Sequence, residues 1–531
     1  MSQPIIRVIS PIDYKMLGDF VPTSASAIRQ QMALAQGAAI QWAKLPVAQR
    51  VKVLSPLKAL LLAKLDAICG VITLTTGKVR TEALLGEVYP ILDLLRYYEN
   101  NAAHILQAKA IATSPFIFPG ATADITRKPY GVVAVISPWN YPFQLTIAPL
   151  LSALFAGNAV IFKASELCLP IGQLILNLLA KLDLPKGLVQ WAVGDGQVGE
   201  YLIDAGPDLV FFTGGLTAGR AVMQRAARHP IPVMLELGGK DPMLVFADAQ
   251  LKRACDGALY GAFCNSGQAC ISVERLYVEQ SCYSQFVQML VEGVEDISLG
   301  HGLLGDLGTV SSERQFEIVQ AHYQDAIAQG ASASAPLRRL VNYVKPIVLW
   351  NVHHGMRVMR EETFGPLLPV MAFTDEAEAI NLANDSEYGL NASIWSLDLT
   401  KAQRVARQLQ VGNWAVNDVL KNAGHSGLPF GGVKRSGFGR YHGAEGLRNF
   451  TYPVSGLVSH SRFSKEPNWF PYSQQRYEDF KGYLDFIYGE GPILRRVKRN
   501  WQALQAFRGY SAFNFAQRLQ NLKAKLPWRQ D

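Results

Sequence analysis

The feature that most constrains the fold of this chain is a series of short, wholly apolar segments that alternate with helical stretches. The apolar segments are residues 132–136, 159–162 and 209–212. The stretches with apolar residues at helical spacing are 144–156, 170–181 and 218–228. A strand that is apolar throughout is buried on both faces, as in a parallel sheet covered by helices. The alternation therefore predicts an α/β fold built on a doubly wound parallel sheet.

A second α/β pattern follows Gly239. Its expected strands are residues 243–246, 276–278 and 367–372, and a helix is expected near 399–409. Residues 24–110, which precede the first sheet, are rich in Ala and Leu at helical spacing and predict a helical layer. Because 531 residues exceed what a single core organises, we expect two or three domains.

Charge is distributed unevenly along the chain. Residues 491–531 hold nine Lys or Arg and one acidic residue, so this tail accounts for the whole net charge of +8. Residues 1–490 hold equal numbers of basic and acidic side chains, so the body of the protein has no electrostatic footprint for nucleic acid. The six cysteines lack the CxxC spacing of a zinc site, and no signal peptide or membrane-spanning segment is indicated. We therefore expect a cytoplasmic protein without a structural metal or a disulfide framework.

A candidate nucleophile closes the segment Phe263–Cys270. Glu236 lies 34 residues upstream of Cys270. A thiol nucleophile and a carboxylate base together suffice to form a thioester and then hydrolyse it. Taken alone, Cys270 could equally be a buried structural cysteine, and Glu236 a surface residue that closes a strand before the turn at Gly238-Gly239. Gly267 and Ala269 would leave the thiol accessible.

A candidate phosphate site follows the third apolar segment. No GxGxxG is present, but Thr213-Gly214-Gly215-Leu216-Thr217-Ala218-Gly219 connects an expected strand to an expected helix. The N-terminus of that helix would suit the pyrophosphate of a dinucleotide.

Five segments, in this order, strongly resemble the NAD(P)-dependent aldehyde dehydrogenase superfamily over about residues 20–460. They are Pro138–Phe143, Leu235–Lys240, Phe263–Cys270, Glu361–Pro366 and Pro429–Gly432. Residues 140–147 and 163–167 are most similar to the branch that handles fatty and aromatic aldehydes. The resemblance implies an α/β aldehyde dehydrogenase-like fold: a Rossmann-type dinucleotide-binding domain, an α/β catalytic domain and a small β oligomerisation extension.

The resemblance also implies roles for three catalytic residues. Cys270 would attack the aldehyde as a thiolate, and the Asn140 amide with the Cys270 backbone N–H would stabilise the oxyanion. After hydride transfer, Glu236 would activate water to release the acid. Asn140 alone could instead be a turn asparagine between two prolines.

The implied cofactor is NAD or NADP, and the implied contacts come from both expected sheets. Lys163 and Glu166 would bind the adenosine ribose, although an ordinary solvated ion pair is the alternative. A carboxylate there favours NAD over NADP. Glu362 would bind the nicotinamide ribose, and Phe364 would pack near the ring unless it is a core residue. The remaining candidates are Trp139, Gly214, Gly215 and Gly219, with Gly215 at a place that the family usually gives to serine.

The predicted domains follow from the same comparison. Residues 20–115 and 131–238 would form the dinucleotide-binding domain, 239–449 the catalytic domain, and 116–130 with 450–460 the oligomerisation extension of a dimer or tetramer. The substrate would be an apolar aldehyde of medium to long chain or aromatic character. A coenzyme A-acylating enzyme and an inactive binding protein on the same fold are the alternatives; the presence of Glu236 disfavours the first, and the retention of all three catalytic residues disfavours the second.

Residues 461–531 form a further basic, aromatic extension. Leu494, Val497, Trp501 and Leu504 predict one helical face, and Phe515, Leu519, Leu522 and Leu526 a second apolar stripe. Basic amphipathic helices with aromatic residues are typical of interfacial membrane anchors. The extension would either dock on an anionic membrane surface through residues 491–531, giving a peripheral membrane protein, or pack on the enzyme itself.

Overall fold

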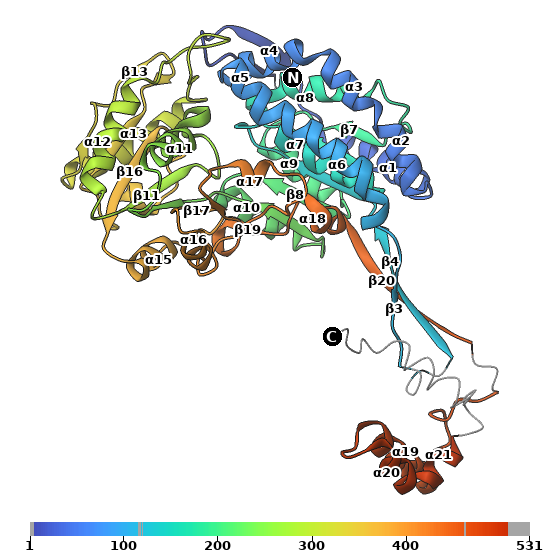
Figure 1. The fold of residues 1–531 in the computed structure, drawn as a ribbon. Coiled ribbons are helices and arrows are strands. Elements are labelled where there is room, and N and C mark those ends of the chain that lie inside the picture. Colours follow the sequence, from blue (N-terminus) through green and yellow to red (C-terminus); the bar gives the residue numbers. More distant parts are fainter. Residues whose placement is uncertain (1–4, 115–117, 119, 461–463, 508–531) are drawn as a thin grey trace. The chain divides into compact units, whose positions relative to one another are not determined.

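The computed structural model describes residues 5–114, 118, 120–460 and 464–507, and the chain divides into two compact units. The first unit comprises residues 1–106 and 128–452, and it contains two large sheets (Figure 1). The second comprises residues 107–127 and 453–531. Each unit is described separately below.

The first large sheet has six strands in the order β19-β9-β8-β5-β6-β7. These strands are β5 (Val132–Ile136), β6 (Ala159–Lys163), β7 (Val189–Trp191), β8 (Leu209–Thr213), β9 (Val233–Glu236) and β19 (Gly437–Phe438). All neighbours are parallel except β19, which pairs antiparallel with β9. Every residue of β5, β6 and β8 is buried, which is why these strands are continuously apolar. The predicted α/β fold with a parallel sheet is confirmed.

Helices pack around this sheet. The N-terminal layer consists of α1 (Ala25–Ala43), α2 (Val47–Leu54), α3 (Pro56–Ala63), α4 (Leu65–Thr76), α5 (Arg80–Ala83), the π-helical turn η1 (Leu84–Val88) and α6 (Tyr89–Ile105). The connecting helices are α7 (Gln144–Ala156), η2 (Glu166–Cys168), α8 (Leu169–Leu179), α9 (Gly196–Asp204) and α10 (Leu216–Ala226). Every residue of α7 is buried, so this helix forms the centre of the core.

The second large sheet has seven strands in the order β12-β15-β16-β11-β10-β17-β18. Its strands are β10 (Asp241–Val245), β11 (Val273–Glu279), β12 (Ser332–Ala333), β15 (Ile347–Trp350), β16 (Leu367–Phe373), β17 (Ser393–Trp395) and β18 (Ala415–Val416), and a short hairpin of β13 (Arg339–Leu340) and β14 (Tyr343–Val344) accompanies it. The helices of this half are α11 (Leu251–Phe263), η3 (Cys264–Gly267), α12 (Tyr283–Glu295), α13 (Glu313–Ala328), α14 (Arg357–Arg360), α15 (Glu376–Asn384), α16 (Leu399–Ala406), α17 (Lys421–Gly424) and η4 (Lys434–Ser436). The last helix of the first unit, α18 (Gly443–Asn449), instead packs against α6 and α7 beside the first sheet.

Several elements of the first unit were not anticipated from the sequence. Among them, a hairpin of β1 (Ile6–Ile9) and β2 (Met16–Phe20) precedes the helical layer, and β7 is too short and too polar to stand out. Another is β19, which returns to the first sheet from within the range assigned to the catalytic domain.

The second unit contains a three-stranded sheet and three helices. Its sheet has the order β20-β4-β3, formed by β3 (Lys109–Ile111), most of β4 (Ala121–Pro129) and most of β20 (Thr451–Ser459). The helices are α19 (Gln474–Tyr488), α20 (Ile493–Arg499) and α21 (Trp501–Ala506). Phe486, Ala503 and Phe507 form their small core.

The helix expected over 493–504 is interrupted at Asn500, between α20 and α21. Its apolar stripe is divided as a result, because Leu494 and Trp501 are exposed whereas Val497 and Leu504 are half-buried. The second predicted stripe, at residues 515–526, lies outside the described residues.

Candidate active site

A cavity of about 300 Å³ lies where the first sheet ends and the second begins. Asn140 follows β5, Gly214 follows β8, and Glu236 is the last residue of β9, so three strand ends of the first sheet supply its wall. This is the edge at which parallel α/β sheets bind their ligands. Eight of the eleven predicted site residues line the cavity: Trp139, Asn140, Gly214, Gly215, Glu236, Cys270, Glu362 and Phe364.

Cys270 is partly exposed, and it follows a strained turn. Asn265, Ser266 and Gly267 have φ values of 53°, 56° and 73°, in the left-handed region that side chains other than Gly disfavour. The Asn265 backbone N–H donates to Glu82 Oε1 at 2.6 Å, and Ser266 Oγ donates to Gly308 O at 2.9 Å. Hydrogen bonds from outside the turn therefore hold it in this conformation.

A glycine is required at position 267 for a different reason from the one expected from the sequence. A Cβ at Gly267 would lie 2.3 Å from the carbonyl oxygen of Gly365. The glycine therefore permits close packing of two backbone segments and a positive φ, rather than access to the thiol.

The surroundings of Cys270 favour the protonated thiol. Desolvation raises the pKa of Cys270 well above its ordinary value, and the nearby carboxylate of Glu236 raises it further. Burial likewise raises the pKa of Glu236 well above its ordinary value, an effect that the Arg440 guanidinium opposes. An ionised Glu236 therefore disfavours the Cys270 thiolate.

Asn140 is fixed by the backbone of the Cys270 segment. Its side-chain Nδ2 donates to the backbone carbonyl oxygen of Gln268 at 3.0 Å, and its backbone carbonyl oxygen accepts a hydrogen bond from Asn265 Nδ2 at 3.1 Å. A side-chain amide has two N–H groups, so one remains for another acceptor.

The N-terminus of α10 forms the part of the cavity that suits a pyrophosphate. Gly215 is the N-cap, no side chain caps the helix, and a Cβ at Gly215 would meet open space. Free backbone N–H groups at such a position bind anions. Gly219 lies one turn further on; its N–H donates to Gly215 O, and a Cβ there would lie 2.5 Å from Leu237. In this structure Gly219 therefore allows close packing of α10, and a direct contact with the cofactor stays a prediction.

Lys163 and Glu166 follow β6 and form an ion pair with 3.1 Å between Nζ and Oε2. Lys163 is buried and Glu166 is exposed. Neither lines the 300 Å³ cavity, but Glu166 and Trp139 line a neighbouring one of about 250 Å³. The exposed carboxylate oxygens of Glu166 suit ribose hydroxyl groups.

The segment Glu362–Phe364 forms the opposite wall. Glu362 Oε1 accepts a hydrogen bond from the Gly239 backbone N–H at 3.0 Å, and burial raises the pKa of Glu362 to about 8. Phe364 has a φ of 52°, and its ring contacts Trp139 edge-on with centroids 5.5 Å apart. A left-handed phenylalanine is strained unless its surroundings hold it.

A buried ion pair supplies that restraint. Lys240 Nζ lies 2.5 Å from Glu274 Oε2, and both side chains are buried. The Glu274 carboxylate accepts hydrogen bonds from the backbone N–H groups of Thr363 (2.7 Å) and Phe364 (2.8 Å). Lys240 Nζ also donates to Thr363 Oγ1 at 3.1 Å. Burial lowers the pKa of the Lys240 ammonium, and Glu274 opposes this shift.

These residues together fit a dinucleotide. The structure offers an uncapped helix N-terminus for the diphosphate, carboxylates at Glu166 and Glu362 for ribose hydroxyls, and the aromatic rings of Trp139 and Phe364 for a flat heterocycle. The fit follows from these hydrogen-bonding groups and aromatic rings.

Sequence reasoning missed several residues of the site. Arg314, Gln315 and Ile318, at the start of α13, line the cavity, and Gln315 Nε2 donates to Thr363 O at 2.9 Å. Ser312 caps this helix, and the spacing Ser312–Gln315 is that of a capping box, which signals a helix start but not a cavity wall. The buried ion pairs were also missed.

Comparisons with known proteins agree with this geometry. The model of the aldehyde dehydrogenase family matches residues 1–455, so the match begins earlier than the quoted motifs indicated. The chain is 68% identical over 526 residues to a 4,4'-diapolycopene aldehyde oxidase of Methylomonas sp., covering 99% of each protein. It is also similar to the NAD-dependent aldehyde dehydrogenase of Sinorhizobium meliloti (31% identity, TM-score 0.84, 88% and 93% coverage). A third similar protein is the betaine aldehyde dehydrogenase of Staphylococcus aureus in complex with NAD+ (29% identity, TM-score 0.82, 88% and 94% coverage).

Proposed function

The chain belongs to the aldehyde dehydrogenase family and is an NAD(P)-dependent oxidoreductase that acts on an aldehyde, and we propose that it releases the carboxylic acid through a thioester on Cys270. The observation that carries this proposal is one cavity that contains a thiol, an amide donor and a carboxylate. These are Cys270, Asn140 and Glu236.

In the first step the partly exposed Cys270 thiol loses its proton to solvent water, and its sulfur attacks the aldehyde carbon, which gives a tetrahedral thiohemiacetal with a negatively charged oxygen. The free N–H of the Asn140 amide and the Cys270 backbone N–H stabilise that oxygen. Bound NAD(P)+ supplies the acceptor for the hydride that leaves this carbon. A thioester on Cys270 remains, and the strained turn before the cysteine keeps the sulfur in place.

In the second step water attacks the thioester. Glu236 removes a proton from the water, the remaining hydroxide adds to the thioester carbon, and the C–S bond breaks. Glu236 then returns the proton to the departing sulfur, so the carboxylic acid leaves, the thiol is restored and the carboxylate is ionised again. Because the pKa of Glu236 is raised, the carboxylate is a stronger base than an exposed glutamate when it is ionised.

Two substitutions test these roles. Cys270→Ala should abolish NADH formation. Glu236→Gln should give a burst of about one NADH per site and then stall, because only hydrolysis is blocked. Steady turnover in either variant would contradict the assignment. Acyl-coenzyme A formation by the unmodified enzyme would instead favour the coenzyme A-acylating alternative.

For the substrate we propose a long apolar aldehyde. The relative from Methylomonas is named for the oxidation of 4,4'-diapolycopene aldehyde, and its similarity extends over 99% of this chain, including the C-terminal extension. A panel of aldehydes of increasing chain length should show kcat/KM rising with apolar length. A preference for short, charged semialdehydes would contradict this proposal.

For oligomerisation we propose a homodimer or a dimer of dimers that pairs through the sheet of the second unit. The outer strand β20 leaves Leu457 and Val458 exposed, and an exposed strand edge is a template for pairing. Sedimentation velocity should give a dimer or larger species, and Leu457→Lys should shift it towards the monomer. A wild-type monomer would contradict the proposal.

For the extension we propose docking on an anionic membrane surface. Residues 464–507 expose several large apolar side chains, among them Trp469, Phe470 (74% exposed), Leu494 (80% exposed) and Trp501. Two of the basic side chains have partners within this unit, because Arg496 donates to the carbonyl oxygens at the end of α19 and Arg499 pairs with Asp485. Among the described residues there is no helix with the length and hydropathy that crossing a bilayer requires, so binding would be interfacial.

Vesicle sedimentation tests this surface. The full chain should bind vesicles that contain anionic lipid, and Phe470→Glu with Leu494→Glu should weaken binding about tenfold or more. The matched control is Leu303→Glu with Leu304→Glu, which changes two equally exposed leucines of the first unit. Equal binding by both double variants would exclude the proposed surface.

A further inference from the structure

A second buried ion pair contacts the segment that carries Asn140, as Lys240 and Glu274 contact the segment that carries Phe364. Lys78 Nζ lies 2.7 Å from Glu87 Oε1, and neither side chain has any exposed surface. Lys78 follows the left-handed Gly77 that ends α4, and Glu87 belongs to the π-helical turn η1. Removing two charges from water is costly unless other polar groups complete their hydrogen bonding.

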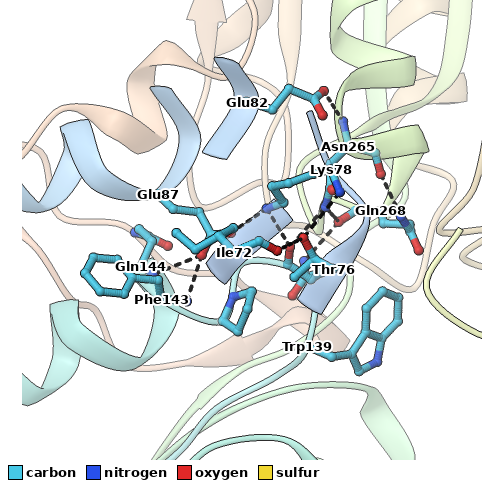
Figure 2. Close-up of polar contacts among 12 residues, drawn as sticks. Ile72, Thr76, Lys78, Glu82, Glu87, Trp139, Phe143, Gln144, Asn265 and Gln268 are labelled. Atoms are coloured by element: carbon cyan, nitrogen blue, oxygen red, sulfur yellow. Dashed lines mark hydrogen bonds and ion pairs between the residues drawn. The ribbon is translucent and has the colours of Figure 1, made fainter. Parts of the chain in front are cut away.

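The other partners of this pair belong to the segment that carries Asn140 (Figure 2). Lys78 Nζ donates to the backbone carbonyl oxygen of Asn140 at 2.9 Å. Glu87 Oε2 accepts hydrogen bonds from the backbone N–H groups of Phe143 (2.7 Å) and Gln144 (3.3 Å). The pair thus forms hydrogen bonds with the backbone at Asn140 and, three residues later, at Phe143.

Glu87 replaces the cap that α7 lacks. Phe143 is the N-cap residue of this helix and provides no side-chain hydrogen bond. The Glu87 carboxylate satisfies the free N–H groups at this end and carries the negative charge that a helix N-terminus favours. The position of the whole buried helix relative to Asn140 therefore depends on a residue 57 positions earlier than Gln144.

The backbone carbonyl oxygen of Asn140 accepts two hydrogen bonds, and its side-chain amide donates one. Lys78 Nζ and Asn265 Nδ2 both donate to this oxygen, at 2.9 and 3.1 Å. The Asn140 amide donates to Gln268 O, two residues before Cys270. The backbone of Asn140 is thus held by Lys78 and Asn265 and its side chain by Gln268, which fixes where the second N–H of the amide points relative to the Cys270 sulfur.

We propose that Lys78 and Glu87 are positioning residues for the reaction, which hold the Asn140 amide where the oxyanion develops. This inference rests on the proposed role of Asn140. Neither residue touches the reacting atoms, so their effect should appear in the chemical steps and not in substrate binding. Loss of a whole oxyanion donor typically costs about a hundredfold or more in rate, so misplacing the donor should cost less, about tenfold.

The test removes both charges together, because removing one would leave the other buried and unpaired. In Lys78→Met/Glu87→Gln, kcat and the rate of the NADH burst should fall about tenfold, while KM for aldehyde and for NAD changes less than about twofold. Alkylation of Cys270 by iodoacetamide should be unchanged, because that reaction forms no oxyanion. Lys58→Met/Glu99→Gln removes a half-buried pair between α3 and α6 and serves as the matched control, with kcat within about twofold of wild type.

A double-mutant cycle separates positioning from general destabilisation. If the pair acts through Asn140, the double substitution should lower kcat no further in an Asn140→Ala background. Equal loss of kcat in both backgrounds would overturn the positioning proposal alone. An unchanged kcat in Asn140→Ala itself would overturn the proposed role of Asn140. Should the double variant not fold, Glu87→Asp, which keeps both charges but draws the carboxylate back from Phe143, should show the same pattern with a smaller loss of kcat.

Discussion

Both halves of the first unit contain a buried lysine–glutamate pair, and the two pairs differ in what they hold. In each, the glutamate accepts from two successive backbone N–H groups: Phe143 and Gln144 for Glu87, Thr363 and Phe364 for Glu274. In the dinucleotide-binding half the pair caps a regular helix and grips the carbonyl of Asn140.

In the catalytic half the pair holds a strained residue instead. Phe364 has a positive φ, and Lys240 donates to the Thr363 hydroxyl rather than to a backbone carbonyl. The residues held there face the bound dinucleotide in our assignment, whereas Asn140 faces the substrate. In our proposal, the Lys78–Glu87 pair therefore supports the chemical steps, and the Lys240–Glu274 pair supports cofactor binding.

The largest effect that would test this comparison concerns stability. Lys78→Ala or Lys240→Ala leaves a buried glutamate without its cation, which should lower the free energy of unfolding by about 3–5 kcal/mol. Urea denaturation followed by fluorescence measures this loss. Lys58→Ala, at the half-buried pair, should cost no more than about 1 kcal/mol. If all three variants lose the same amount, burial does not distinguish the pairs.

The kinetic contrast should be smaller. Lys240→Met/Glu274→Gln frees Phe364 from its restraint, so KM for NAD should rise about tenfold, with a smaller change in kcat. This is the reverse of the pattern expected for Lys78→Met/Glu87→Gln. Initial-rate kinetics with NAD varied at saturating aldehyde measures it. Identical kinetic patterns for the two double variants would show that the two pairs are not specialised.

A third prediction concerns the coupling between Glu236, at the end of the first sheet, and Cys270. The Glu236 carboxylate raises the pKa of the Cys270 thiol, so Glu236→Gln should lower that pKa and speed alkylation of Cys270 about twofold to fivefold. The gain should grow as pH rises through the raised pKa of Glu236, because only the ionised carboxylate opposes the thiolate. Iodoacetamide kinetics against pH measures it, and slower alkylation would mean that Glu236 instead removes the thiol proton.

The smallest kinetic effect is expected for a substitution at Glu166, which forms no hydrogen bond with either buried pair. Its exposed carboxylate repels a 2′-phosphate in our assignment, so Glu166→Gln should raise the ratio of kcat/KM for NADP to that for NAD about threefold. Arg404→Gln, at an exposed ion pair of the catalytic half, is the control. An unchanged cofactor ratio would place the adenosine ribose away from Glu166.

The sequence predicted the parts of this site that follow local rules. Continuous apolar runs identified β5, β6 and β8 because a strand buried on both faces needs no polar residue. Asn140 and Glu236 then lay at strand ends, where ligands bind, and family motifs drew attention to Cys270. Neither periodicity nor motif, however, indicates that Lys78 and Asn140 are hydrogen-bonded, since 62 residues separate them.

The parts that sequence reasoning missed depend on tertiary partners. Lys78 and Glu87 lie in a helical stretch where charged residues usually face water, and only the packed structure shows that both are buried. The helix expected at 493–504 failed for a related reason. Arg496 lies off the predicted apolar face, yet it donates to the carbonyl oxygens of Phe486 and Ile487 at the end of α19, and α20 ends soon afterwards at Arg499.

The pairing of β19 with β9 has a consequence for synthesis of the chain. Gly437 pairs with Glu236, so the strand that ends in the proposed base stays an open edge until the catalytic half has been made. At about 5–20 residues per second, a ribosome needs roughly 10–40 s for the intervening 200 or so residues. Throughout that interval β9 pairs with β8 on one side only, and its other edge is of the kind on which chains aggregate. The last strand of this sheet to emerge therefore completes the sheet and also covers that edge.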